Sequence, residues 1–138
     1  MSIGYNAFSG CTSLTAVYFK GKTPSLPDGE PVFGSSDKAI VYYLPETTGW
    51  DSMFGGRPAV LWNPQVLTSD ASFGVRAGQF GFTITGTSGL VIVVEASADL
   101  ANPVWTPVGT NTLAGGSSYF SDPQWTNYPS RFYRLRPP

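Results

Sequence analysis

Histidine is absent from this chain of 138 residues, and cysteine occurs once, at Cys11. Without histidine, the commonest general base and the commonest metal ligand are both missing, which argues against zinc and haem sites and against His-assisted serine or cysteine chemistry. A single cysteine excludes an intramolecular disulfide bond. We therefore predict a protein without catalytic activity, cofactor or metal centre.

Charge and long apolar runs are scarce as well. Charged residues make up 12% of the chain, and the net charge is −1. Because basic and acidic residues are almost balanced in both halves, we expect no nucleic acid partner. No apolar run approaches the roughly 20 residues of a membrane span, so we expect no membrane insertion. The first residues lack a basic stretch followed by an apolar one, so the chain as written has no expected export signal.

Turn-forming and aromatic residues are, by contrast, abundant. Glycine occurs 16 times and proline 12 times, and 14% of the residues are aromatic. Together with stretches rich in Thr, Ser and Val, this composition favours strands and turns over helices. The sequence predicts a mostly β protein, folded as one medium domain or two small ones with thin cores.

Three apolar segments predict strands in the first 64 residues, at 14–19, 39–44 and 59–62. Val17 and Val41 begin similar triplets and are 24 residues apart, within the period of about 20–29 residues that is typical of leucine-rich repeats. The first two strands are therefore expected to stack in parallel. Alternation places Val17 and Phe19 in the core and Tyr18 on the opposite face. Residues 47–54 predict a short helix or a tight turn.

The pattern of strand and turn segments changes at Asn63-Pro64. This change predicts a domain boundary, with one domain over 1–64 and another over 65–138. Short segments separated by turn signals predict an antiparallel β-sandwich in the second domain. Their ranges are 65–72, 79–86, 90–97, 105–113, 117–121 and 131–136. We expect Trp105 to fill the sandwich core.

The last of these segments carries three arginines. Strand alternation places Arg134 and Arg136 on one face and Arg131 on the other, so they do not assemble a nucleic-acid patch by themselves. Pairing of this strand with 90–97 would bring Arg134 or Arg136 near Glu95, and we favour that arrangement.

The first segment resembles the terminal repeat of the BspA-like leucine-rich repeats of bacterial surface proteins. The residues that carry the resemblance are Ile3-Gly4, Ala7-Phe8, Gly10-Cys11 and Ser13-Leu14, followed by the strand with Val17 and Phe19. Residues 42–45, 47–50, 56–58 and 61–64 are similar to the cap that closes such arrays. The resemblance covers 1–64 and implies a short parallel sheet with a cap and a small buried Cys11. We expect the large Trp62 side chain to fill the end of the stack.

The second domain resembles the small β-rich modules that close secreted proteins of Verrucomicrobia and related bacteria. The carriers of this resemblance are 94–100, 105–108, 119–122 and 131–135. It implies an immunoglobulin-like or fibronectin-like antiparallel β-sandwich with no chemistry of its own. It also implies an extracellular or cell-surface location, and with it a role in adhesion or as a scaffold.

A single repeat cannot bury its own apolar face, which suggests a self-assembly edge. The residues of this edge are Ile3, Phe8, Leu14, Val17 and Phe19. Another copy of the chain would cover it, giving a dimer or a filament, or else another surface protein would do so.

A second set of residues is the candidate ligand surface. Tyr18, Lys20 and Tyr42 would form the exposed face of the first sheet, and Trp125 and Tyr128 lie in a loop-like stretch where their rings could stack on sugars. The alternative function is therefore a glycan-binding accessory module, with polysaccharide as the partner.

Acidic residues offer weaker signals. Asp28 with Glu30, and Glu46 with Asp51, are close enough in sequence to suggest a glycosidase pair, although solvated loop charges explain them better. Calcium binding through the aspartates at strand ends is a further alternative. Those aspartates are Asp70, Asp99 and Asp122.

Overall fold

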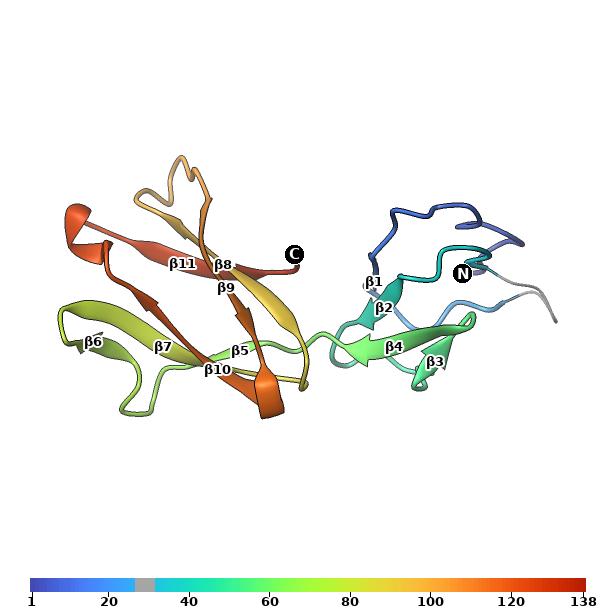
Figure 1. Cartoon of the computed structure of the whole chain (residues 1–138), viewed down its shortest axis with the longest axis horizontal. Coiled ribbons are helices and arrows are strands. Elements are labelled where there is room, and N and C mark those ends of the chain that lie inside the picture. Colours follow the sequence, from blue (N-terminus) through green and yellow to red (C-terminus); the bar gives the residue numbers. More distant parts are fainter. Residues whose placement is uncertain (27–31) are drawn as a thin grey trace. The chain divides into compact units, whose positions relative to one another are not determined.

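The computed structural model describes residues 1–26 and 32–138, so the pair Asp28 and Glu30 lies outside the described residues. The chain divides into two compact units, Met1–Asn63 and Pro64–Pro138, called here the N-terminal and C-terminal units (Figure 1). Strands are the main regular elements of both, as predicted. The described part of the chain has only short 3-10 turns as helices, none with the length and hydrophobicity to cross a bilayer.

The N-terminal unit is built on a sheet of four strands in the order β1-β2-β4-β3. Their bounds are Ala16–Phe19 (β1), Ile40–Tyr43 (β2), Met53–Phe54 (β3) and Arg57–Leu61 (β4). β1, β2 and β4 are parallel, and Val17 lies opposite Val41. The parallel pairing predicted from the spacing of 24 residues is therefore confirmed.

The helix considered for residues 47–54 does not form. This segment instead ends in β3, which pairs antiparallel with β4. The turn between these strands is Gly55-Gly56, where φ is 55° and 81°. Two consecutive positive φ values suit a tight hairpin turn, and glycine adopts them without steric cost.

The core of the N-terminal unit lies on one face of its sheet. Phe19 and Val41 are buried there, and the loop before β2 adds Val32 and Phe33, which are at most 1% exposed. The ring of Phe8 stacks on Phe33 with a centroid distance of 5.3 Å. The predicted inward direction of Val17 and Phe19 is confirmed, because both pack in this cluster.

The C-terminal unit consists of two antiparallel sheets. One sheet has the order β10-β7-β5, with β6 also paired to β7, and the other has the order β11-β8-β9. The bounds in the first sheet are Gln65–Leu67 (β5), Gly74–Arg76 (β6), Gln79–Thr85 (β7) and Ser117–Asp122 (β10). Those in the second are Val91–Ser97 (β8), Thr106–Thr112 (β9) and Phe132–Arg136 (β11).

The predicted strand 65–72 is shorter than expected. It ends at Leu67, and Asp70 then turns the chain by accepting hydrogen bonds from the backbone N–H and the hydroxyl of Ser72. A short aspartate side chain competes in this way with the strand hydrogen bonds.

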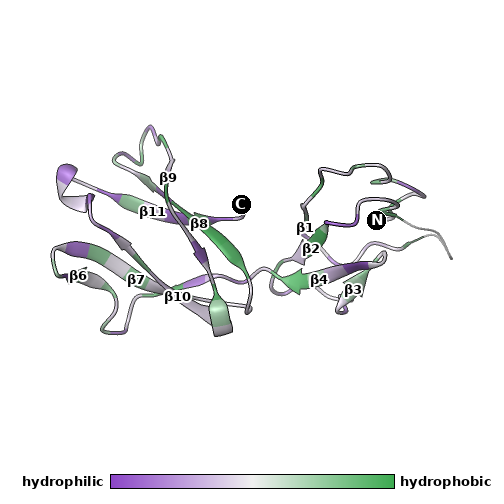
Figure 2. Ribbon diagram, viewed as in Figure 1, coloured by the Kyte–Doolittle hydropathy of each residue, from purple (hydrophilic) through white to green (hydrophobic). Residues whose placement is uncertain are grey.

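Aromatic and aliphatic side chains fill the space between the two sheets. Tyr133 of β11 contacts Phe82 and Phe120 of the opposite sheet, with centroid distances of 5.8 Å and 5.9 Å. Ile84 and Ile92 are fully buried between the layers. Figure 2 shows a continuous hydrophobic stretch in the first part of β8, which begins Val-Ile-Val-Val. All residues of β8 after Val91 are buried, including Glu95 and Ser97.

The last strand pairs with β8, as predicted. Glu95 accepts hydrogen bonds from Nε of Arg134 at 2.7 Å and of Arg136 at 2.6 Å, so both arginines reach it. The prediction that Trp105 fills the core is wrong. Its ring is half-buried and lies 4.4 Å from the guanidinium carbon of Arg134. An aromatic ring gains from a cation on its face without full burial.

Candidate functional site

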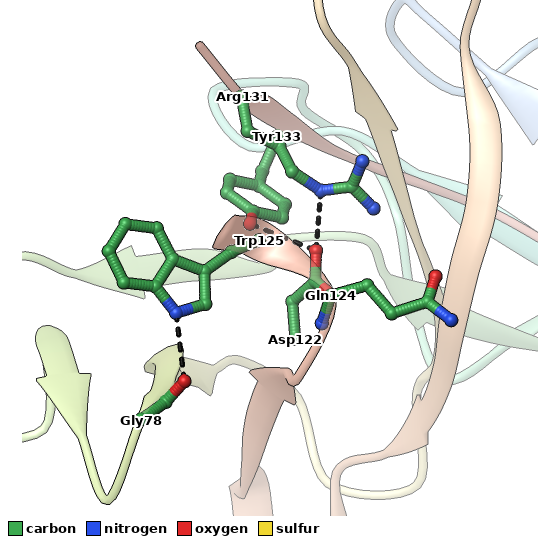
Figure 3. A network of polar contacts seen from close by, with 6 residues as sticks. All are labelled: Gly78, Asp122, Gln124, Trp125, Arg131 and Tyr133. Atoms are coloured by element: carbon green, nitrogen blue, oxygen red, sulfur yellow. Dashed lines mark hydrogen bonds and ion pairs between the residues drawn. The ribbon is translucent and has the colours of Figure 1, made fainter. Parts of the chain in front are cut away.

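A polar network lies where β10 ends and the chain turns towards β11 (Figure 3). Asp122, the last residue of β10, is 4% exposed. Its Oδ1 accepts a hydrogen bond from the backbone N–H of Gln124 at 2.8 Å. Its Oδ2 accepts one from Nε of Arg131 at 2.5 Å and one from the hydroxyl of Tyr133 at 3.1 Å. Both oxygens are therefore engaged within the fold.

The surroundings of this network change the acidity of two groups. Burial, together with the nearby charge of Asp122, raises the pKa of Tyr133 to about 12, so its hydroxyl stays a donor. Burial opposes the charge of Arg131, but the hydrogen bonds to Asp122 and Tyr128 and the charge of Asp122 together outweigh it, so the pKa of Arg131 is raised. The Arg131 side chain is 9% exposed and its guanidinium carbon lies 4.0 Å from the centre of the Tyr128 ring. These contacts fix Arg131 in one position.

Beside the network lies a groove of about 630 Å³, which is a size typical of small-ligand sites. One wall comes from the connection between β8 and β9, with Asp99, Asn102 and Val104, and the other from Gln124, Tyr128 and Arg131. In Figure 3 the terminal nitrogens of Arg131 and the amide of Gln124 lie on the same side of Asp122. They offer a ligand hydrogen-bond donors beside a mainly apolar wall.

A smaller hollow of about 220 Å³ lies next to the groove and contains Trp125. The indole Nε1 of Trp125 donates a hydrogen bond to the carbonyl of Gly78 at 3.0 Å, which holds the half-buried ring in place. Tyr128 lines both the hollow and the groove. The structure thus brings the two predicted aromatics Trp125 and Tyr128 to one end of the C-terminal unit.

Sequence reasoning did not anticipate the pair of Asp122 and Arg131. Asp122 was a candidate for calcium and Arg131 a member of a split basic cluster. The two residues are nine positions apart. Asp122 ends β10 and Arg131 directly precedes β11, and these strands lie in opposite sheets, so no strand or helix period links the two residues. The one available signal was Asp122-Pro123, which marks a turn that can direct a side chain back onto the strand end.

The other predicted ligand residues lie in the N-terminal unit. The rings of Tyr18 and Tyr42 stack with a centroid distance of 5.0 Å, and Trp62 packs edge-on against both at 5.9 Å. Both tyrosines are consequently half-buried, whereas an open face was expected; Lys20 is exposed. Burial, with a contribution from Tyr42, raises the pKa of Tyr18 to about 12. Trp62, expected at the end of the stack, lies on this tyrosine face.

The predicted self-assembly edge surrounds β1, which is an edge strand. Ile3, Phe8, Leu14 and Val17 are half-buried against the core and Phe19 is buried, so the chain itself covers part of this edge. Tyr5 nearby in sequence is 61% exposed.

The expectation that Cys11 is buried is wrong, because its thiol is exposed. The sulfur lies 3.9 Å from the carbonyl oxygen of Ser9 and contributes little to the core.

The three aspartates considered for calcium share a local role. Asp70, Asp99 and Asp122 each accept a hydrogen bond from the backbone N–H two residues later. Within the described ranges no group of three Asp, Glu, His or Cys residues is arranged to hold a metal ion. These carboxylates shape turns, and turn formation is a common use of aspartate at a strand end.

Comparison of the chain with protein-family models, with curated proteins and with solved structures gave no match.

Proposed function

We propose that the chain is a non-catalytic extracellular or cell-surface protein that acts in adhesion, and that its C-terminal unit binds glycans through the groove and the adjoining Trp125 hollow. The observation that carries the proposal is the convergence of Trp125, Tyr128 and Arg131 at one end of the C-terminal unit. Loops held by a β scaffold are frequent positions for recognition residues.

The chemistry of this end suits a sugar chain. A pyranose has an apolar face and a ring of hydroxyl groups that both donate and accept hydrogen bonds. The fixed Trp125 ring offers a flat apolar surface, and the groove offers amides, a carboxylate and a guanidinium. The groove opens beside the exposed side chain of Val104, which is 77% exposed, so an extended chain has room to pass.

The carboxylates of the groove favour binding over catalysis. Hydrolysis of a glycosidic bond ordinarily needs two carboxyl groups that face the scissile bond. Both carboxylate oxygens of Asp122 accept hydrogen bonds, from Gln124, Arg131 and Tyr133. Asp99 is then the remaining carboxylate that lines the groove. A single free carboxylate supports recognition without turnover.

The test is affinity electrophoresis of the full chain through gels that contain polysaccharides of different composition. We expect at least one polysaccharide to retard the chain, and Trp125→Ala to abolish most of the retardation. Tyr5→Ala is the matched control, because it removes an exposed aromatic ring from the other unit and should leave the mobility unchanged. Equal loss in both variants, or retardation by no polysaccharide, would refute the proposal.

Self-assembly through the β1 edge is the second candidate function. It is favoured by the four half-buried apolar residues at this edge and by the position of β1 at the end of its sheet, because edge strands are prone to pair with another chain. Light scattering over a concentration series should then give a mass that rises above that of one chain, and Val17→Lys should reduce it. A mass of one chain at every concentration would exclude this role.

A further inference from the structure

We infer that the groove selects neutral sugar chains over acidic ones, an inference that rests on the proposed glycan binding. The selectivity follows from how the fold uses the charged groups at the groove. These are two carboxylates, Asp99 and Asp122, and one guanidinium, that of Arg131.

The charge of Arg131 is not available as a free positive site. Its Nε donates to Asp122 at 2.5 Å, and both side chains are at least nine-tenths buried. Opposite charges at this distance cancel for any group that approaches from the groove. The terminal nitrogens of Arg131 remain as hydrogen-bond donors, on the side away from Trp125 in Figure 3.

Asp99 is then the uncompensated charge at the groove. It is exposed at the rim, and its Oδ1 accepts the backbone N–H of Ala101 at 2.8 Å, which fixes the carboxylate on this side. A ligand carboxylate or sulfate would enter a groove whose net charge is negative. Repulsion between like charges works against acidic sugars, and no free cation of the groove offsets it.

The remaining polar groups match hydroxyls. The side-chain amides of Asn102 and Gln124 make no hydrogen bond to other described residues, and each can both donate and accept. The second oxygen of Asp99 accepts, and the terminal nitrogens of Arg131 donate. A sugar hydroxyl can use either kind of group, whereas a carboxylate can only accept. This mixture of donors and acceptors points to neutral sugars with free hydroxyls.

The experiment measures binding of the full chain to a neutral glucan and mannan and to the acidic polymers alginate and polygalacturonate, at low salt. We expect the neutral polymers to bind about fivefold more tightly, the size of effect that one charge at close range has in a largely aqueous setting. Asp99→Asn keeps the Oδ1 acceptor and should reduce the preference to about twofold or less. Asp70→Asn is the control, since it removes an exposed carboxylate of a similar turn elsewhere in the same unit.

Added salt should reduce the preference of the unmodified chain for neutral over acidic polymers, because salt screens exposed charges. The smaller preference of the Asp99→Asn variant should stay almost unchanged. Gln124→Ala should weaken binding to neutral polymers without unfolding the unit, because only the backbone N–H of Gln124 holds Asp122. Tighter binding of alginate or polygalacturonate, or a preference that Asp99→Asn does not change, would overturn the inference and leave glycan binding standing. Absence of binding to all four polymers, repeated with the wider polysaccharide panel, would refute the proposed function itself.

Discussion

The N-terminal and C-terminal units both contain an aromatic cluster, an ion pair and a tyrosine whose pKa is raised to about 12, but they bury these features differently. In the C-terminal unit a second sheet covers the first, and both Asp122 and Arg131 lie inside. In the N-terminal unit one sheet is covered by loops, and Asp37, which pairs with Arg57, has a side chain that is 78% exposed. A two-layer fold can therefore hold a fixed polar network that a single covered sheet does not provide.

The largest expected effect concerns the two cores. Phe82 is 2% exposed between two sheets, whereas Phe8 is half-buried at the edge of the N-terminal core. We expect Phe82→Ala to destabilise the C-terminal unit by about 4 kcal/mol, and Phe8→Ala to cost its unit about 1–2 kcal/mol, because fewer contacts are lost. Hydrogen exchange followed by mass spectrometry reports on each unit separately. Equal losses would show that the edge of the N-terminal unit is covered.

The two ion pairs provide a second contrast. Removing the carboxylate in Asp122→Ala leaves Arg131 buried without a partner, so the C-terminal unit should lose about 3 kcal/mol. In Asp37→Ala the remaining Arg57 stays in contact with solvent, and the loss should be below about 1 kcal/mol. Urea unfolding of the full chain, with hydrogen exchange to assign the unit, checks both values. A small effect of Asp122→Ala would contradict the structural role of the network.

The two tyrosines sharpen the comparison further. The hydroxyl of Tyr133 donates to Asp122, whereas that of Tyr18 is buried and has no hydrogen-bond partner among the described residues. Tyr133→Phe should therefore cost about 1 kcal/mol, while Tyr18→Phe should be neutral or slightly stabilising.

The raised pKa values of these tyrosines also give a pH dependence. The ordinary tyrosine pKa is 10.0, and both tyrosines have a pKa of about 12 in the folded chain. Their contribution to stability is complete below pH 10 and is lost as the pH rises to about 12. In each Phe variant, the unit that carries the substitution should lose less stability between pH 9 and pH 11 than in the unmodified chain. Thermal unfolding at these two pH values measures the difference.

The smallest expected effect is at acid pH and concerns the C-terminal unit. The hydrogen bonds from Arg136 and Arg134 lower the pKa of Glu95 from 4.5. A lowered carboxyl pKa contributes stability above the unfolded value, and this contribution is lost as the pH falls through the folded value. In Glu95→Gln, the unfolding temperature should therefore decrease less between pH 5 and pH 2 than it does in the unmodified chain. An unchanged decrease would show that Glu95 does not govern it.

Local patterns predicted the strands well but not the partners of individual polar residues. The spacing of 24 residues between Val17 and Val41 gave the parallel pairing, and strand alternation placed Phe19 inside. The predicted pairing of the last strand with 90–97 placed Arg134 or Arg136 near Glu95, and in the structure both reach it. Trp105 and Cys11 were misplaced because burial depends on what covers a position, and no local pattern contains that information. The same reason explains the partial burial of Tyr18 by Trp62.

The sequence by itself determined that this is a mostly β protein with a change of organisation near Pro64, because turn residues and alternating apolar positions act over a few residues. Only the tertiary structure decided the candidate site. The strand that ends at Asp122 and the strand that begins after Arg131 lie in opposite sheets, and their packing alone brings the carboxylate, the guanidinium and the Tyr128 ring together. Such a meeting depends on the arrangement of two layers, which no short stretch of sequence specifies.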